Sequence, residues 1–263
     1  MNIYRKKNII KKCFMEFFGT GLVMFFGIGC LAASKLTNAN FTQFEISCIW
    51  GFGVSIAIYF SSSISGAHLN PAVTIFFWLS SKLNKRKVLP YIISQTLGSF
   101  FFTMLTYYLY NNLLISFERN NNVVRGTQES LNLASIFCVY PNYNNSFIYD
   151  FIIEILSTAL FILIVLEFNN RNSNYFLYNR SVAPILTGFL VCMINLVINP
   201  LNNISLNPAR DLGPKILLSL TGWGLFSFTG GNDNILYCFI PIMGPILGAN
   251  LGGWIHKTLI NNS

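Results

Sequence analysis

The tripeptide Asn-Pro-Ala occurs twice, at Asn70 and at Asn207, and is the clearest candidate in the sequence for a site that binds a solute. Proline fits the first turn of a helix, where its missing N–H would lack a partner, and asparagine before it is a good N-terminal cap. Pro71 and Pro208 therefore mark two helix N-termini, each with an amide and a positive dipole end beside it. Such a pair offers donors to neutral hydroxylated solutes and repels cations.

The backbone before each cap is predicted to be non-helical. Irregular backbone at membrane depth is tolerated only where it is buried in protein or lines a water-filled path. Its carbonyl groups need donors, and waters or solute hydroxyls would supply them. We therefore expect a ladder of acceptors along a path, formed by Gly66, Ala67, His68, Leu69, Asn203, Ile204, Ser205 and Leu206.

A lone arginine, Arg210, follows the second motif directly. A charge inside a membrane is a functional candidate by default, and a guanidinium has five donors for solute hydroxyls. Trp50 is expected to form the opposite, apolar wall, which suits glycerol with its carbon face and hydroxyl face. The alternatives are an Arg210 that extends outward to the interface and a Trp50 that belongs to an interfacial belt.

Two glutamates, Glu16 and Glu154, occupy matched places inside apolar runs. Buried carboxylates require partners, and the N–H groups of the irregular segments are the expected ones. We therefore predict that both are structural braces. The alternative role, carrying protons, would make the protein an active transporter.

The composition indicates a membrane as the solvent. Of 263 residues, 53% are hydrophobic and only 10% are charged, whereas a soluble domain carries about 25% charged residues. Two apolar segments, starting at Asn70 and Asn207, run for roughly ten residues and are too short to cross a bilayer. Six full spans are predicted, at 13–34, 44–62, 88–110, 147–168, 182–200 and 235–256.

The charges lie between the apolar runs. Most basic residues occupy the N-terminus, 81–87, 169–181 and the C-terminal tail, so both termini are expected to face the cytoplasm of a plasma (inner) membrane, with 111–146 and 221–233 outside. No soluble basic face is available for nucleic acid. None of the six cysteines has metal-ligand spacing, and no nucleophile–base pair is apparent. We therefore expect no enzyme activity, cofactor or metal.

An internal repeat organises the chain. Leu69-Asn-Pro-Ala and Leu206-Asn-Pro-Ala have an offset of 137 residues, and Gly51-Phe-Gly-Val matches Gly188-Phe-Leu-Val at the same offset. Each half, about 10–112 and 147–258, holds three spans and one short segment, so the halves must be related by a two-fold axis in the membrane plane. The predicted fold is an all-α membrane protein, one transmembrane channel domain over 1–263, with six helices and two re-entrant half-helices.

The paired motifs, with Arg210 after the second, resemble the major intrinsic proteins, which are aquaporins and glycerol facilitators. Ser65-Gly-Ala-His-Leu-Asn-Pro-Ala-Val-Thr and Asn207-Pro-Ala-Arg-Asp-Leu-Gly-Pro-Lys carry the resemblance, which covers about residues 10–258. Asp211 and the 111–146 connection are similar to the glycerol subgroup. The resemblance implies a homotetramer in the lipid bilayer, with one pore per subunit for glycerol, polyols and water, and Asp211 as a further brace.

Two positions of the narrow filter depart from that family. The glycerol facilitators usually have Phe where this chain has Ile204 and Gly where it has Asn195. Ile204 keeps an apolar corner without a flat ring, and Asn195 adds polarity and bulk. A passive glycerol channel that excludes ions is the leading hypothesis, with a water-selective channel as the alternative. A proton-coupled secondary transporter also stays open, because inverted repeats occur in that class as well.

Overall fold

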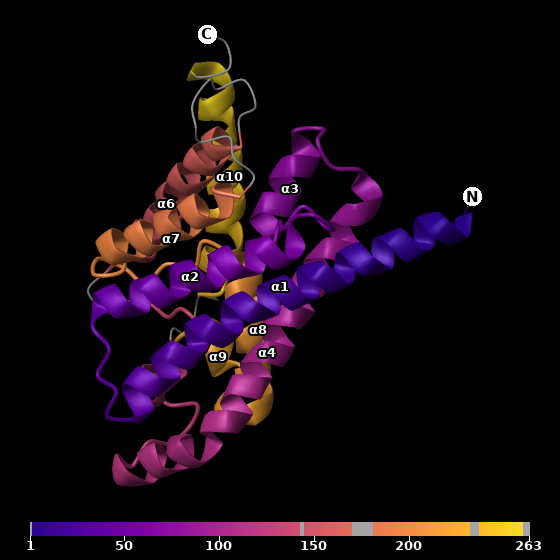
Figure 1. The fold of residues 1–263 in the computed structure, drawn as a ribbon. Helices are drawn as coiled ribbons and strands as arrows, with labels where there is room; N and C mark the ends of the chain where they lie inside the picture. The colour runs from indigo at the N-terminus through magenta and orange to yellow at the C-terminus, as the bar shows by residue number, and fades with distance from the viewer. Residues whose placement is uncertain (1, 143–144, 170–180, 232–236, 260–263) are drawn as a thin grey trace.

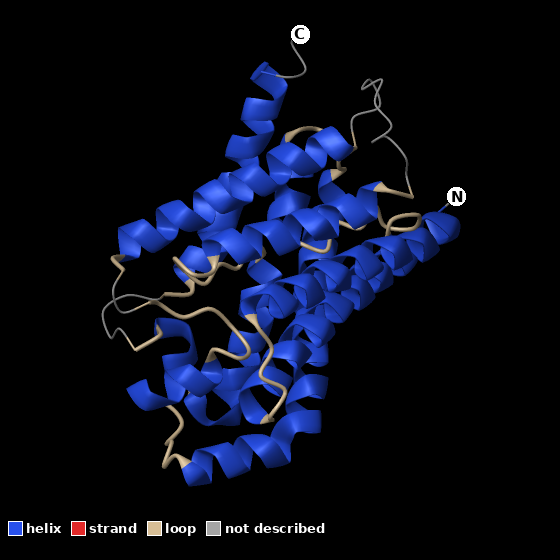
Figure 2. Cartoon of the chain, turned by 60° about the vertical axis from the view of Figure 1, so that its left-hand side comes forward, coloured by secondary structure: helices blue, strands red, loops and turns tan. Residues whose placement is uncertain are grey.

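The structure, a computed structural model, describes residues 2–142, 145–169, 181–231 and 237–259, and every regular element in these ranges is a helix (Figure 2). The six long helices are α1 (Asn2–Leu36), α2 (Gln43–Ser61), α4 (Lys85–Asn120), α6 (Phe147–Phe168), α7 (Ala183–Ile198) and α10 (Phe239–Leu259). Four of them, α1, α2, α4 and α6, are long and apolar enough to cross a membrane. The other two are α7, with 16 residues, and α10, which contains Pro245.

The polarity of the molecule is inverted relative to a soluble protein. Large apolar side chains on α2 and α7, such as Phe52 and Phe189, are exposed, while small polar side chains are buried. A surface of this kind is stable only against an apolar solvent. The buried polar residues on the long helices include Thr20, Ser47, Ser55, Gln95, Ser99, Thr103, Thr158 and Thr187.

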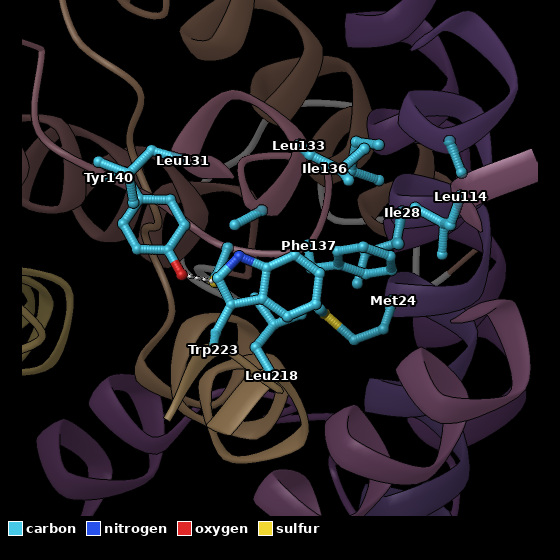
Figure 3. Close-up of a cluster of buried hydrophobic side chains, with 13 residues drawn as sticks. Met24, Ile28, Leu114, Leu131, Leu133, Ile136, Phe137, Tyr140, Leu218 and Trp223 are labelled. Carbon is cyan, nitrogen blue, oxygen red and sulfur yellow. Dashed lines mark hydrogen bonds between the residues drawn. The ribbon is translucent and has the colours of Figure 1, made fainter. Parts of the chain in front are cut away.

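Residues 111–120 belong to α4, so the prediction of one connection over 111–146 was wrong in its first part. This helical extension is held in place because Leu114 is fully buried in a hydrophobic cluster. The chain then forms the short helices η1 (Gln128–Ser130) and α5 (Leu131–Ala134) and packs against α1 and Trp223 (Figure 3). The stretch from 221 is likewise structured up to 229, within the π-helix η2 (Ser219–Trp223) and α9 (Phe226–Thr229).

Helix pairs in the two halves pack in the same way. Helix α1 packs along α4, as Figure 1 shows, and α6 packs along α10. A Cβ atom at Gly98 of α4 would lie 2.0 Å from the carbonyl oxygen of Phe17, and one at Gly248 of α10 would lie 2.3 Å from that of Ile155. Gly98 and Gly248 therefore allow equivalent close helix crossings in the two halves.

We predict that Gly98→Ala lowers the stability of the protein by about 1–3 kcal/mol, because the methyl group forces α1 and α4 apart. Thermal unfolding in detergent measures this as a lower melting temperature. Gly29→Ala in α1 is the matched control, since no atom lies within 4 Å of its Cβ position. An equal melting temperature for both variants would contradict the prediction.

Candidate functional site

Two half-helices, α3 (Pro71–Leu79) and α8 (Pro208–Leu218), begin at the two Asn-Pro-Ala motifs, which confirms the predicted caps. The Oδ1 atom of Asn70 accepts a hydrogen bond from the N–H of Ala72 at 2.8 Å. Asn207 makes the equivalent bond to Ala209 at 3.0 Å. Each cap therefore fixes its amide group, with the oxygen turned into the helix and the nitrogen turned away from it.

The two N-termini meet through reciprocal hydrogen bonds. The Nδ2 atom of Asn70 donates to the carbonyl oxygen of Leu206 at 2.7 Å, and that of Asn207 donates to the carbonyl oxygen of Leu69 at 2.8 Å. An amide nitrogen has two N–H donors. Each asparagine thus uses one of them to join the halves and keeps the second for another acceptor.

Two buried carboxylates hold the segments that lead to these caps. Glu16 accepts the N–H groups of His68 at 3.0 Å and Leu69 at 2.7 Å. Glu154 accepts those of Ser205 at 2.9 Å and Leu206 at 2.6 Å. This arrangement fits the brace that the sequence predicts, since both carboxylates are occupied by backbone donors.

The backbone of these segments adopts positive φ angles, which are rare in residues other than glycine. Gly66 has φ of 96°, and Ala67, Leu69 and Leu206 have φ of 49°, 51° and 57°. Residues held there cost about 1–3 kcal/mol each, so neighbouring contacts must enforce them. Successive N–H groups turned to one side in this way form a concave site for an anion, which here is the carboxylate.

The carbonyl groups on the other side of these segments are open. Those of Gly66, Ala67, His68, Asn203, Ile204 and Ser205 accept no hydrogen bond from the described part of the chain. Buried carbonyl groups need partners. These acceptors are therefore available to a molecule that passes along the segments.

A cavity of about 940 Å³ runs beside both segments. One face of α2 lines it from the first residue of the helix to the position after the last, at Gln43, Ile46, Trp50, Val54, Ile58 and Ser62. Those residues span about 28 Å at a rise of about 1.5 Å per residue, close to the hydrocarbon thickness of about 30 Å. The cavity therefore follows the whole membrane-crossing length of α2.

All thirteen residues predicted for the path line this cavity. Sequence reasoning missed the walls supplied by long helices, among them Val23, Val54, Ile58, Phe161, Val165, Thr187 and Val191. Their spacing on α2 and α7 follows a helical period, but a span that is apolar all round does not distinguish the face toward a path from the face toward lipid.

Arg210 and Trp50 lie side by side in the cavity wall. The guanidinium carbon of Arg210 is 5.0 Å from the centre of a Trp50 ring, which is a cation–π contact. The expectation of opposite walls was therefore wrong, because this distance leaves no room for a solute between them. The cavity wall therefore presents guanidinium donors next to an apolar ring at this point.

A buried ion pair next to Arg210 supports this part of the cavity wall. Asp211 accepts the N–H of Val139 at 2.7 Å and pairs with Lys215, whose Nζ also donates to the carbonyl oxygen of Val139 at 2.9 Å. Both charged side chains are fully buried. Asp211 therefore ties the chain after α5 onto α8, and Lys215, which sequence reasoning missed as its partner, neutralises it.

A second clamp is centred on Arg125, which follows the C-terminal end of α4. Its guanidinium donates to Glu118 at 2.5 Å, to the hydroxyl of Tyr107 at 2.8 Å and to the carbonyl oxygen of Thr221. Burial alone would lower the pKa of Arg125, but the bond to Glu118 and the neighbouring Tyr107 raise the pKa above its usual value. The clamp stays charged and fixes η2 against α4.

Comparisons with known proteins agree with this architecture. The family model described as major intrinsic protein matches residues 3–256. Two glycerol uptake facilitator proteins are similar over nearly the whole chain. The one from Buchnera aphidicola subsp. Schizaphis graminum is 57% identical over 97% of this chain and 98% of its own length. The one from Escherichia coli strain K12 is 45% identical over 95% of this chain and 88% of its own.

Two further relatives extend the comparison. The propanediol uptake facilitator of Citrobacter freundii is 42% identical over 96% of this chain and 93% of its own length. Among solved structures, the aquaglyceroporin from Plasmodium falciparum superposes with a TM-score of 0.80 at 25% identity, covering 96% of this chain and 97% of that one.

Proposed function

The chain belongs to the major intrinsic protein family, and we propose that it is a passive channel, not an enzyme, through which glycerol and related small uncharged solutes cross a membrane down their gradient. The relatives that are named for glycerol uptake support the solute, and the cavity beside α2 supports the route.

One observation carries the proposal: a single cavity follows α2 over a length close to the thickness of a bilayer. Its lining offers open carbonyl acceptors on two segments and one spare N–H from each of Asn70 and Asn207. A solute with hydroxyl groups exchanges its hydration for these partners as it moves. A solute without them leaves buried polar groups unpaired and is held back.

Ions are excluded by the same layout. Among the described residues, the cavity lining includes no Asp or Glu that would replace the hydration of a cation. Two helix N-termini and the guanidinium of Arg210 add positive potential at the centre. An anion finds no chain of basic partners beyond Arg210 and Lys35, because most of the other lining residues are apolar or neutral.

Glycerol flux in proteoliposomes tests the proposal. Vesicles that contain the protein should shrink and then re-swell after a hyperosmotic glycerol step, faster than empty vesicles, as light scattering reports. Re-swelling at the rate of empty vesicles would refute a glycerol channel. Water flux without glycerol flux would indicate a water-selective channel, and acceleration by a proton gradient would indicate coupled transport.

We further propose that Trp50, Arg210, Ile204 and Asn195 form the selectivity filter. We expect Asn195→Gly to raise, and Ile204→Phe to lower, the permeability of erythritol relative to glycerol, because the first change vacates space and the second fills it. A change of one methylene group is worth about 1 kcal/mol or more, roughly fivefold in rate. Stopped-flow re-swelling with each solute measures the ratio.

The control for this pair is Asn169→Gly, the same chemical change at a cavity residue outside the proposed filter. Its erythritol-to-glycerol ratio should equal that of the unmodified protein. If all three variants share one ratio, Asn195 and Ile204 do not determine solute choice.

We also propose the setting of the channel: a homotetramer in the bacterial inner membrane, with both termini in the cytoplasm and halves of about 10–112 and 147–258 in inverted orientation. The reciprocal bonds of Asn70 and Asn207 and the equivalent crossings at Gly98 and Gly248 support the repeat. The exposed apolar surface supports contact with lipid and with neighbouring subunits.

A further inference from the structure

Helices α2 and α7 pack antiparallel along a seam of regularly spaced contacts. Moving along α2 toward its N-terminus, the hydroxyl of Tyr59 donates to the carbonyl oxygen of Ser181, and that of Ser55 donates to the carbonyl oxygen of Pro184 at 3.0 Å. Next, a Cβ atom at Gly51 would lie 2.4 Å from the carbonyl oxygen of Gly188. The two helices therefore approach most closely at these glycines.

The next contact on this seam joins two thiols. The Sγ atoms of Cys48 and Cys192 lie 3.6 Å apart, and both cysteines are free. A Cβ atom at Gly51 would lie 3.1 Å from the Cβ of Cys192, so the helices are close enough here for a covalent link. Among the described residues no other two thiols are in sulfur–sulfur contact, and Cys30 and Cys138 bond to oxygen atoms instead.

Cys48 and Cys192 are close in sequence to residues of the proposed filter but do not line the cavity. Cys48 precedes Trp50 by two residues, and Cys192 precedes Asn195 by three. Neither cysteine lines the cavity. A link between them would therefore fix the spacing of two helices that form the path without entering it.

We propose that Cys48 and Cys192 are an oxidisable pair, which a peroxide converts into a disulfide that ties α2 to α7. Sulfur atoms in a disulfide are about 2.05 Å apart, so closure from the present contact needs only a small movement of two side chains. In the topology proposed above, this end of the seam faces the periplasm, where disulfides persist.

The chemistry balances with one molecule of hydrogen peroxide. Cys48, which is partly exposed, loses its thiol proton, and the thiolate attacks a peroxide oxygen, breaks the O–O bond and becomes a sulfenic acid. The hydroxide that leaves takes up the released proton and becomes the first water. The thiol of Cys192 then attacks this sulfur, forms the S–S bond and displaces a second water. Two thiols are oxidised and one peroxide is reduced.

Purified protein treated with hydrogen peroxide, then alkylated under denaturing conditions and digested, tests the pair by mass spectrometry. We expect a peptide pair joined through Cys48 and Cys192, and a fall in reactive thiols from six to four. The oxidised protein should run as a monomer on a denaturing, non-reducing gel, and its melting temperature should rise and return after reduction.

Cys48→Ser and Cys192→Ser should each abolish the joined peptides and the rise in melting temperature. Cys13→Ser is the matched control and should retain both, because Cys13 lies away from this seam. Links that join other cysteines or different subunits, or oxidation of Cys48 to a sulfinic acid without a link, would overturn the proposal. None of these readouts depends on glycerol flux, so failure here is distinct from failure of the proposed function.

Discussion

Arg210→Ala is expected to raise the permeability of sorbitol relative to glycerol by about tenfold, which corresponds to a barrier lower by about 1.4 kcal/mol. The guanidinium occupies the cavity wall beside Trp50, so its removal widens the path where a solute passes along both groups. The variant also loses the positive charge that opposes cations. We therefore expect potassium leakage as well, measured as decay of a membrane potential across proteoliposomes.

Arg119→Ala is the matched control for this prediction, since Arg119 lies exposed in the last turn of α4 and outside the cavity. The same loss of one positive charge there should leave the sorbitol-to-glycerol ratio and the potassium leak unchanged. An Arg210→Ala variant with unchanged ratios would remove Arg210 from the proposed filter.

Lys215→Met is expected to destabilise the protein by about 3 kcal/mol, because the buried carboxylate of Asp211 loses its nearest cation and keeps only the guanidinium of Arg210, 3.9 Å away. Both side chains are fully buried, and both bond to Val139. The segment after α5 would lose its attachment to α8, next to Arg210. Melting temperature in detergent measures the loss, and lower glycerol flux should accompany it.

The double variant Asp211→Asn with Lys215→Met distinguishes an unpaired charge from lost packing. Asparagine still accepts the N–H of Val139 but carries no charge, so the double variant should be more stable than Lys215→Met alone. The coupling should be about 2 kcal/mol or more, within the range for residues in contact. If the two effects simply add, the ion pair does not determine stability at this position.

Most of the architecture could be predicted because its signals are local or repeated. Asn-Pro at 70 and 207 predicts helix starts from the geometry of proline and the asparagine cap alone, and both caps are present. Bounds were harder. The α4 extension beyond 110 depends on the burial of Leu114 against α1 and the segment after α5, and a polar, Asn-rich stretch gives no local sign of such packing.

The site residues likewise differ in how well the sequence predicts them. Backbone-lining residues next to the motifs were predicted because chain connectivity places them there, and all of them line the cavity. The partner of Asp211 was missed although Lys215 is only one helical turn away, because the sequence also permits an exposed lysine. Arg210 and Trp50 were expected on opposite walls, whereas their separation of 5.0 Å depends on how α8 packs toward α2.

Composition, the repeated motifs and the two Asn-Pro caps are enough to predict a membrane protein with a repeat and with short helices that start at Asn70 and Asn207, because composition and capping act through solvent and nearest neighbours. The face that each helix turns to the cavity, and the contact of Cys48 with Cys192, become visible only in the folded chain. Those outcomes depend on contacts between residues far apart in the chain, which a linear pattern does not encode.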